Sequence, residues 1–186
     1  MSEGATDFLE IEHKFVVDDA FDRDAFFDRC RALAPLREKA LTVTDTYYVP
    51  PGSANRIYRH RIDREIQQLT LKSRGGDNEV RTEINLELGA KRSQAEAVEA
   101  WMRILGATPG YGISKDIRVF DYPDCEIVFY KASHGARHVC CVEFEAKHAE
   151  SEAQGLLLLR KYEAHLGFHS DLREKVNLFD LLVQLP

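Results

Sequence analysis

Apolar and polar residues alternate with a period of two along several stretches of this chain, and that period predicts β-strands. The first stretch covers residues 10–17. Because successive side chains of a strand point to opposite faces, one of its faces is ionic and the other is largely apolar. The ionic face carries Glu10, Glu12 and Lys14, and the apolar face carries Leu9, Ile11, His13 and Phe15. A helix would scatter these charges around its circumference, so the pattern favours a strand.

Seven further stretches are predicted as strands, with turn residues between them. They are residues 41–49, 56–63, 66–73, 80–88, 113–122, 126–132 and 138–146. In four of these strands, charged or polar residues recur two apart on one face, opposite a largely apolar face. Those residues are Arg59 and Arg61; Thr70 and Lys72; Arg81, Glu83, Asn85 and Glu87; and Glu143, Glu145 and Lys147. Together with the first strand, five strands therefore have one charged face.

Apolar residues three and four apart predict helices between and after the strands. An acidic turn at residues 18–24 leads into a helix over residues 25–33. A second helix follows Ser93, whose side chain is expected to form a capping box with Glu96. Two more helices are predicted at residues 150–166 and at about residues 172–185. Runs of antiparallel strands interrupted by a few helices indicate an α+β fold, and residues 1–186 are expected to form a single domain.

The fold must place the charged faces of the five strands where their charges are solvated or paired. If the sheet curls into a closed or nearly closed eight-stranded antiparallel barrel with helices packed outside, every charged face points into the lumen. Uncompensated charge is costly to bury, which favours a water-filled tunnel where carboxylates hold Mg²⁺ or Mn²⁺ and basic residues hold a polyanion such as phosphate. The alternative is an open sheet with a solvated face. That face would carry scattered Ser, Thr, Gln and Lys, whereas this chain repeats pairs of Glu or of Arg.

Length and composition exclude several classes of protein. Of the 186 residues, 44% are hydrophobic and 30% are charged, which is typical of a soluble globular domain. The net charge of −6 argues against general nucleic-acid binding. Residues 1–7 lack a signal-peptide pattern, and no run of eighteen apolar residues occurs that could form a transmembrane helix. The four cysteines lack the spacing of a metal site and are expected to be reduced thiols. A cytoplasmic protein with no membrane partner is therefore expected, as a monomer or as an oligomer.

The ordered set of charged motifs resembles the CYTH family, also called triphosphate tunnel metalloenzymes. The motifs that carry the resemblance are Glu10-x-Glu12-x-Lys14, Arg59-x-Arg61, Lys72 at the end of a strand, Arg81-x-Glu83 and Glu143-x-Glu145. The resemblance extends over almost the whole chain. It implies an eight-stranded antiparallel barrel that binds a small-molecule triphosphate together with divalent metal ions. Class IV adenylyl cyclases and thiamine triphosphatases belong to this family.

The resemblance also implies a role for each matching residue. The metal ligands would be Glu10, Glu12, Glu83, Glu143 and Glu145. The residues that bind the phosphate chain would be Lys14, Arg59, Arg61, Lys72 and Arg81, joined by Lys115, Arg118 and Lys175. Among these, Glu10, Glu12, Lys14 and Lys72 would be catalytic.

Three parts of the second half depart from the family pattern. Lys115 and Arg118 are three apart, so both face inward only if a β-bulge intervenes. The family often has an Asp before its last Glu-x-Glu strand, where residues 126–131 contain none, and Tyr130 or Lys131 is expected at that place. Lys175 is followed by Val176 and Asn177, where the family has Ser and Tyr.

The leading hypothesis is metal-dependent hydrolysis of a triphosphate, either inorganic tripolyphosphate or a nucleoside or thiamine triphosphate. Neighbouring carboxylates raise one another's pKa, so an activity that favours neutral to alkaline pH is expected. One alternative is an adenylyl cyclase that makes cyclic AMP from ATP. The other is a module that binds polyphosphate or a nucleotide without turnover.

Overall fold

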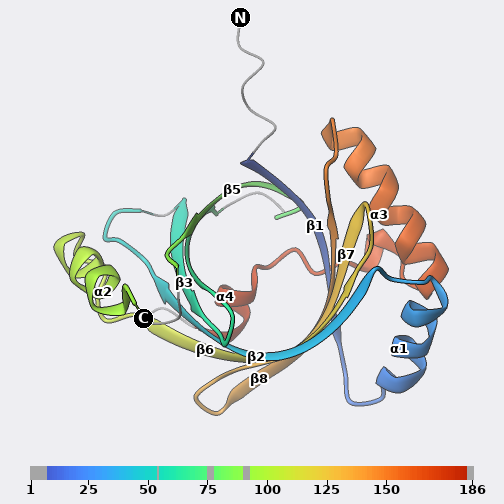
Figure 1. The fold of residues 1–186 in the computed structure, drawn as a ribbon, viewed down its shortest axis with the longest axis horizontal. Helices are drawn as coiled ribbons and strands as arrows, with labels where there is room; N and C mark the ends of the chain where they lie inside the picture. The colour runs from blue at the N-terminus through green and yellow to red at the C-terminus, as the bar shows by residue number, and fades with distance from the viewer. Residues whose placement is uncertain (1–7, 54, 75–77, 90–92, 184–186) are drawn as a thin grey trace, which may run out of the picture.

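The computed structural model describes residues 8–53, 55–74, 78–89 and 93–183. Its strands form a closed barrel in the order β1-β5-β4-β3-β2-β6-β7-β8, and every neighbouring pair is antiparallel (Figure 1). The strands are β1 (Leu9–Val17), β2 (Arg37–Tyr48), β3 (Arg56–Ile62), β4 (Gln67–Ser73), β5 (Val80–Glu87), β6 (Tyr111–Asp121), β7 (Cys125–His134) and β8 (Arg137–Ala146). The predicted α+β fold with an eight-stranded barrel is confirmed.

The first strand closes the barrel because it pairs on both sides. Its first residues, 9–11, pair with β5, and residues 12–17 pair with β8. This register places Glu10 opposite Arg81, and it places Glu12 opposite Glu145. Strand β2 begins four residues earlier than predicted, at Arg37, because residues 37–40 pair with the end of β6.

Helices cover the outside of the barrel. Helices α1 (Arg23–Ala32) and α3 (Glu152–Leu166) pack on one side, where Phe26, Phe27 and Leu159 join the apolar outer residues Phe15 and Phe144. On the other side, α2 (Ala95–Ile104) packs Val98 and Met102 near Leu69. Burying each such side chain contributes about 1.5–3 kcal/mol, so the apolar faces of the strands are stabilised outside the barrel and their charged faces are left inside.

Two predictions about the helix ends are wrong. Helix α2 has Gln94 as its N-cap without a side-chain hydrogen bond, while the Ser93 hydroxyl donates to the Leu88 carbonyl at 3.2 Å instead of forming a capping box. The helix expected at residues 172–185 is shorter: a 3-10 turn, η2 (Ser170–Leu172), and an extended stretch precede α4 (Leu178–Leu182), and residues 184–186 lie outside the described residues.

The extended stretch before α4 is stabilised by β1. The Glu174 amide donates to the Lys14 carbonyl at 2.6 Å, and the Lys14 ammonium donates to the Val176 carbonyl at 2.5 Å. Asn177 then caps α4 by accepting a hydrogen bond from the Asp180 amide. These hydrogen bonds with β1, one from the backbone of Glu174 and one from the side chain of Lys14, replace helical hydrogen bonds, so the helix begins late.

Helix α4 covers one end of the barrel interior (Figure 1). Its buried side chains pack against inward-facing residues of β2, β6 and β7. Leu178, Phe179 and Leu182 belong to the same buried cluster as Tyr47, Ile57, Ile113, Tyr130 and Cys141.

Among the described residues, no helix is long and apolar enough to cross a membrane.

Candidate functional site

The barrel encloses a cavity of about 280 Å³ whose wall is mostly polar or charged. Every strand contributes to its lining. The charged lining residues are Glu10, Glu12, Lys14, Arg59, Arg61, Lys72, Arg74, Arg81, Glu83, Lys115, Glu126, Glu143 and Glu145. The alternation of the strands therefore directs the predicted glutamates, Lys14, Arg59, Arg61, Lys72, Arg81 and Lys115 into one space.

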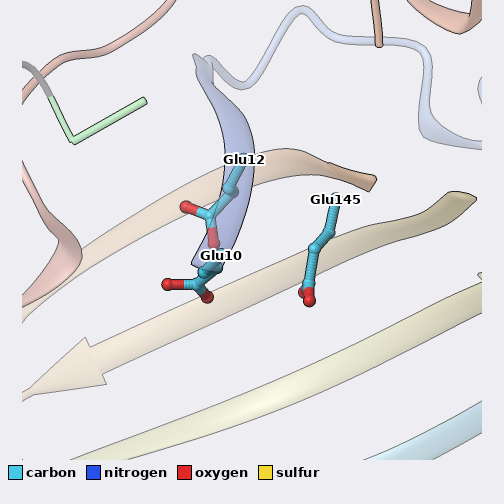
Figure 2. Close-up of side chains that lie close together, drawn as sticks. All are labelled: Glu10, Glu12 and Glu145. Carbon is cyan, nitrogen blue, oxygen red and sulfur yellow. The ribbon is translucent and has the colours of Figure 1, made fainter. Parts of the chain in front are cut away.

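Three carboxylates lie close enough to share one cation. Glu10 and Glu12 come from β1 and Glu145 from β8, and one carboxylate oxygen of each lies within 4.8 Å of the others (Figure 2). The other two predicted ligands line the cavity with other partners. Glu83 forms ion pairs with Lys72 and with Arg59, the latter at 3.5 Å. Glu143 accepts a hydrogen bond from the Tyr130 hydroxyl at 2.6 Å.

The electrostatics of this cluster favour a divalent cation. Burial raises the pKa of Glu12 to about 7; the positive charge of Arg81 opposes this shift, and the charges of Glu143 and Glu10 add to it. Burial, followed by the charges of Glu10 and Glu12, raises the pKa of Glu145 well above its usual value. Carboxylate oxygens are ligands that Mg²⁺ and Mn²⁺ prefer, and a bound cation would relieve the repulsion between these carboxylates. The three residues therefore fit such an ion.

Two basic residues hold the acidic cluster in place. The Lys72 ammonium lies 3.0 Å from Glu10 Oε1, and the Arg81 guanidinium binds both Glu10 and Glu12, with Nη2 at 3.0 Å from Glu12 Oε2. Burial acts to raise the pKa of Glu10, but the charges of Lys72 and Arg81 hold it well below its usual value. Glu10 is therefore ionised at neutral pH.

Arg59 offers a hydrogen-bond donor to the cavity. It is 8% exposed, and its Nη2 donates to the Thr70 hydroxyl at 3.1 Å. Its buried Nε donates to no partner among the described residues. A buried donor without a partner is costly, so an anion such as phosphate is a chemically suitable ligand at this position.

Asp45 forms ion pairs with two residues of the cavity wall, Arg61 and Lys115, and the sequence analysis missed it. It is fully buried and accepts from Arg61 Nε at 2.8 Å and from Arg61 Nη2 at 2.9 Å, while Lys115 Nζ lies 2.9 Å away. Burial disfavours the ionised form, yet Arg61 and Lys115 hold the pKa of Asp45 well below its usual value. Asp45 shares a strand face with Leu41 and Val43, and this alternation could have indicated that it points into the barrel. Its partners Arg61 and Lys115 come from two other strands, so the sequence pattern of β2 does not identify them.

The expectation that Arg118 faces the cavity is wrong. The β2–β6 register is continuous from residue 111 to residue 121, so no bulge reverses the alternation after Lys115. Arg118 lies on the outer face, where Nη1 donates to Glu38 at 2.9 Å and the guanidinium carbon lies 5.5 Å from the centroid of the Phe27 ring. Lys175 is exposed and is not placed at the cavity; Asn177, two residues later, lines it.

Strand β7 supplies Tyr130 and Glu126 where the family pattern suggested an Asp. Tyr130 is buried and lines the cavity, whereas Lys131 is exposed on the opposite face. Glu126 also lines the cavity and pairs with Glu145 in the β7–β8 register. Burial raises the pKa of Glu126, and the charge of Asp121 adds to the shift. Sequence reasoning overlooked Glu126, although it shares a strand face with Tyr130.

His13, on the outer face of β1, contacts two carboxylates. It is fully buried, with Nδ1 at 2.5 Å from Glu163 Oε1 and Nε2 at 2.5 Å from Glu79 Oε1. Burial alone would lower the pKa of His13, but the hydrogen bonds with Glu163 and Glu79 raise it above its ordinary value. The contact with Glu163 links β1 to α3 and so helps to fix the strand that carries Glu10 and Glu12.

The fold of this chain is similar to those of several solved structures. No family model matches the sequence, and no curated protein matches it. The protein PH1012 from Pyrococcus horikoshii OT3 is similar with a TM-score of 0.76 at 16% identity, over 94% of this chain and 99% of that chain. A candidate adenylate cyclase from Vibrio parahaemolyticus gives a TM-score of 0.69 at 14% identity, over 94% of this chain and 97% of its own.

A third similar structure is HpAC1 from Hippeastrum, a candidate adenylyl cyclase described as revealing a dominant triphosphatase activity. Its TM-score is 0.61 at 17% identity, over 92% of this chain and 93% of that chain. At such identities the similarity establishes a shared fold. The resemblance to the tunnel fold of the CYTH family, predicted from the charged motifs, is thereby confirmed as a resemblance of fold.

Proposed function

We propose that this protein is a metal-dependent triphosphatase whose substrate binds inside the barrel. The observation that carries the proposal is the meeting of two chemistries in one cavity. A cluster of three carboxylates, Glu10, Glu12 and Glu145, adjoins the basic side chains of Lys72 and Arg81. Carboxylates suit a hard cation, and guanidinium and ammonium groups suit phosphate oxygens.

Glu10, Glu12 and Glu145 would hold Mg²⁺ or Mn²⁺, with Glu83 and Glu143 on the same cavity wall as further carboxylates. When bound, such an ion neutralises phosphate charge and lowers the pKa of a coordinated water. Binding and orienting the substrate would be the task of the protein's own side chains.

The basic residues bind and orient the phosphate chain. Arg59 donates through its unpartnered Nε, and Lys72 and Arg81 contribute positive charge beside the acidic cluster. Because they face the same cavity, they also stabilise the negative charge that develops on the departing diphosphate. Lys14, which is 4% exposed, supplies a further positive charge from β1.

The hydrolytic step requires a water molecule in line with the bond that breaks. The water oxygen forms a bond to the terminal phosphorus, the phosphorus–oxygen bond to the diphosphate breaks, and a proton leaves the water. A carboxylate of the cavity wall would accept that proton at an oxygen atom. The products are orthophosphate and diphosphate for tripolyphosphate, or orthophosphate and a diphosphate ester for an organic substrate.

Two other functions use the same cavity. In an adenylyl cyclase the ribose 3′-hydroxyl of ATP attacks the α-phosphorus and diphosphate leaves, and two similar structures are candidate cyclases. A binding module would hold a triphosphate without turnover, and the presence of Tyr130 in place of an Asp keeps that alternative open.

Measuring the products from tripolyphosphate and from ATP, with Mg²⁺ and with Mn²⁺, separates these functions. The native chain is compared with Glu10→Gln and with Glu99→Gln, a matched control on the exposed side of α2. Orthophosphate release that is lost in Glu10→Gln and kept in Glu99→Gln is the expected result. Diphosphate with a cyclic nucleotide from ATP would establish the cyclase, and saturable binding without any release would establish the binding module.

A further inference from the structure

Helix α2 has a second apolar face that points away from the barrel. A helix at a protein surface usually has one apolar stripe, which faces the core. In α2 that stripe contains the buried residues Val98 and Met102. Ala97, Trp101 and Ile104 form the second face, because residues three and four apart lie on one side of a helix. Ile104 is 83% exposed and Trp101 is 45% exposed, so two large apolar side chains lie next to each other in water.

The second face continues into a groove of about 340 Å³ between α2 and the strands β4 and β5. Its apolar lining consists of Leu69, Leu88, Ala97, Val98 and Trp101. Leu86 pairs with Leu69 in the β4–β5 register and is 49% exposed, so it extends the apolar surface beyond the groove. The exposed residues of this surface, here called the α2 patch, are Leu86, Ala97, Ala100, Trp101, Ile104 and Leu105.

The α2 patch lies on the side of the barrel away from α1 and α3 (Figure 1). Single apolar residues are ordinary at a protein surface, whereas a contiguous apolar patch bordered by polar residues is typical of an interaction site. The bordering residues on α2 are Glu96, Glu99 and Arg103, and all three are exposed. The patch therefore has the apolar centre and the charged rim of a protein interface.

The shape of the patch is complementary to a second copy of itself. Along the second face, Ala97 and Ala100 are small, whereas Trp101 and Ile104 are large. We consider two copies of α2 that pack antiparallel about a twofold axis between Ala100 and Trp101. Ile104 of one copy then lies opposite Ala97 of the other, at the groove, and Trp101 lies opposite Ala100. Each large side chain meets a small one, as close packing of two helices requires.

The charges beside the patch fit the same arrangement. Glu96 and Arg103 are seven residues apart, which is about two turns, so they lie on one flank of α2. The twofold axis places this flank of one copy beside the same flank of the other. At a rise of 1.5 Å per residue, Glu96 of one copy then lies within about 3 Å, along the helix axis, of Arg103 of the other. Parallel helices would instead place like charges together, so the charges favour the antiparallel pair.

We propose that this chain forms a symmetric homodimer through the α2 patch, with α2 packed antiparallel against its copy. The interface is isologous, because each copy contributes the same residues, and it closes at two copies. Helix α2 has ten residues, so the contact is at the small end of stable interfaces, and we expect a Kd on the order of 10 µM. The residues of the patch do not line the charged cavity, so this inference is independent of the proposed function.

Trp101 reports on the dimer directly, because it is the single tryptophan of the chain. Sedimentation equilibrium and tryptophan emission are measured from about 1 to 200 µM protein, a range that brackets the expected Kd. The native chain should pass from monomer to dimer, and its emission should shift to shorter wavelength as Trp101 leaves water. Ile104→Glu should weaken dimerisation at least tenfold, because it places a charge in the apolar centre of the interface.

The matched control is Leu157→Glu on α3, a leucine that is 70% exposed and lies outside the patch, and it should leave the Kd unchanged. Because Ile104 is exposed, Ile104→Glu should keep the native thermal midpoint and the native rate of tripolyphosphate hydrolysis. A native chain that stays monomeric throughout the concentration range, or a dimer that Ile104→Glu leaves unchanged, would overturn the inference. A monomer whose Trp101 emission shifts on lipid vesicles would also overturn it, since a membrane would then occupy the patch.

An exchange of charges tests the antiparallel arrangement. Glu96→Arg and Arg103→Glu should each weaken dimerisation about threefold, because each places like charges across the interface. The double variant should restore the native Kd, since it rebuilds both pairs with the charges reversed. A double variant no tighter than the single variants would overturn the arrangement of the two helices.

Discussion

Replacement of the buried Asp45 by Asn tests the central ion-pair network of the barrel. In the native protein this carboxylate is fully buried and lies within 2.8–2.9 Å of three donor atoms of Arg61 and Lys115. Removing one partner of a buried ion pair costs about 3–5 kcal/mol. The side chains of Arg61 and Lys115 stay 21% and 7% exposed, so water compensates part of the loss and we expect about 2–3 kcal/mol.

The effect depends on pH in a direction that the structure fixes. The pKa of Asp45 is lowered in the folded protein, whereas an unfolded Asp titrates at about 3.9. Its contribution to stability is therefore complete above pH 4 to 5 and is lost as the pH falls through the folded pKa. The native chain and Asp45→Asn should differ most near pH 7, and their stabilities should converge in acid.

Urea denaturation at several pH values measures this difference. With a slope of about 2 kcal/mol per molar urea, the midpoint of Asp45→Asn should fall by about 1 M at pH 7. The matched control is Asp116→Asn, on the exposed face of β6, where we expect a change within about 0.5 kcal/mol. An unchanged midpoint for Asp45→Asn at pH 7, or a difference that persists unaltered to pH 3, would refute the reasoning.

Three further predictions concern ligands. Arg59→Lys is expected to weaken tripolyphosphate binding about tenfold by calorimetry, because an ammonium does not reproduce the guanidinium fork. Arg118→Lys, the matched change on the outer face, should alter that affinity less than twofold. Glu145→Gln should weaken Mg²⁺ binding at least tenfold relative to Glu99→Gln, since a neutral amide replaces a clustered carboxylate. Chelation with EDTA should abolish phosphate release, and added Mg²⁺ or Mn²⁺ should restore it.

Specific outcomes would contradict each of these. Equal effects of Arg59→Lys and Arg118→Lys would show that charge alone, without position, governs anion binding. Unaltered Mg²⁺ affinity in Glu145→Gln would remove the carboxylate cluster as the metal site. Phosphate release that continues in EDTA would exclude a metal-dependent reaction.

The sequence alone determined which side chains enter the barrel. The period-two alternation placed Glu10, Glu12 and Glu145 on charged strand faces, because the direction of a side chain follows from the local backbone of its own strand. The same rule indicated that Arg118 and Lys115 would face opposite ways without a bulge, and the continuous β6 register shows that they do.

The tertiary structure decided which of those side chains meet. Asp45 binds Arg61 and Lys115 because β2 pairs with β3 on one side and with β6 on the other, and no local pattern specifies that register. The same holds for His13, whose partners Glu79 and Glu163 are distant in sequence, and for α4, which begins late because the preceding residues bond to β1. A side chain's direction is a property of two or three neighbouring residues, whereas its partners depend on how strands far apart in the chain are aligned, and only the packed barrel fixes that alignment.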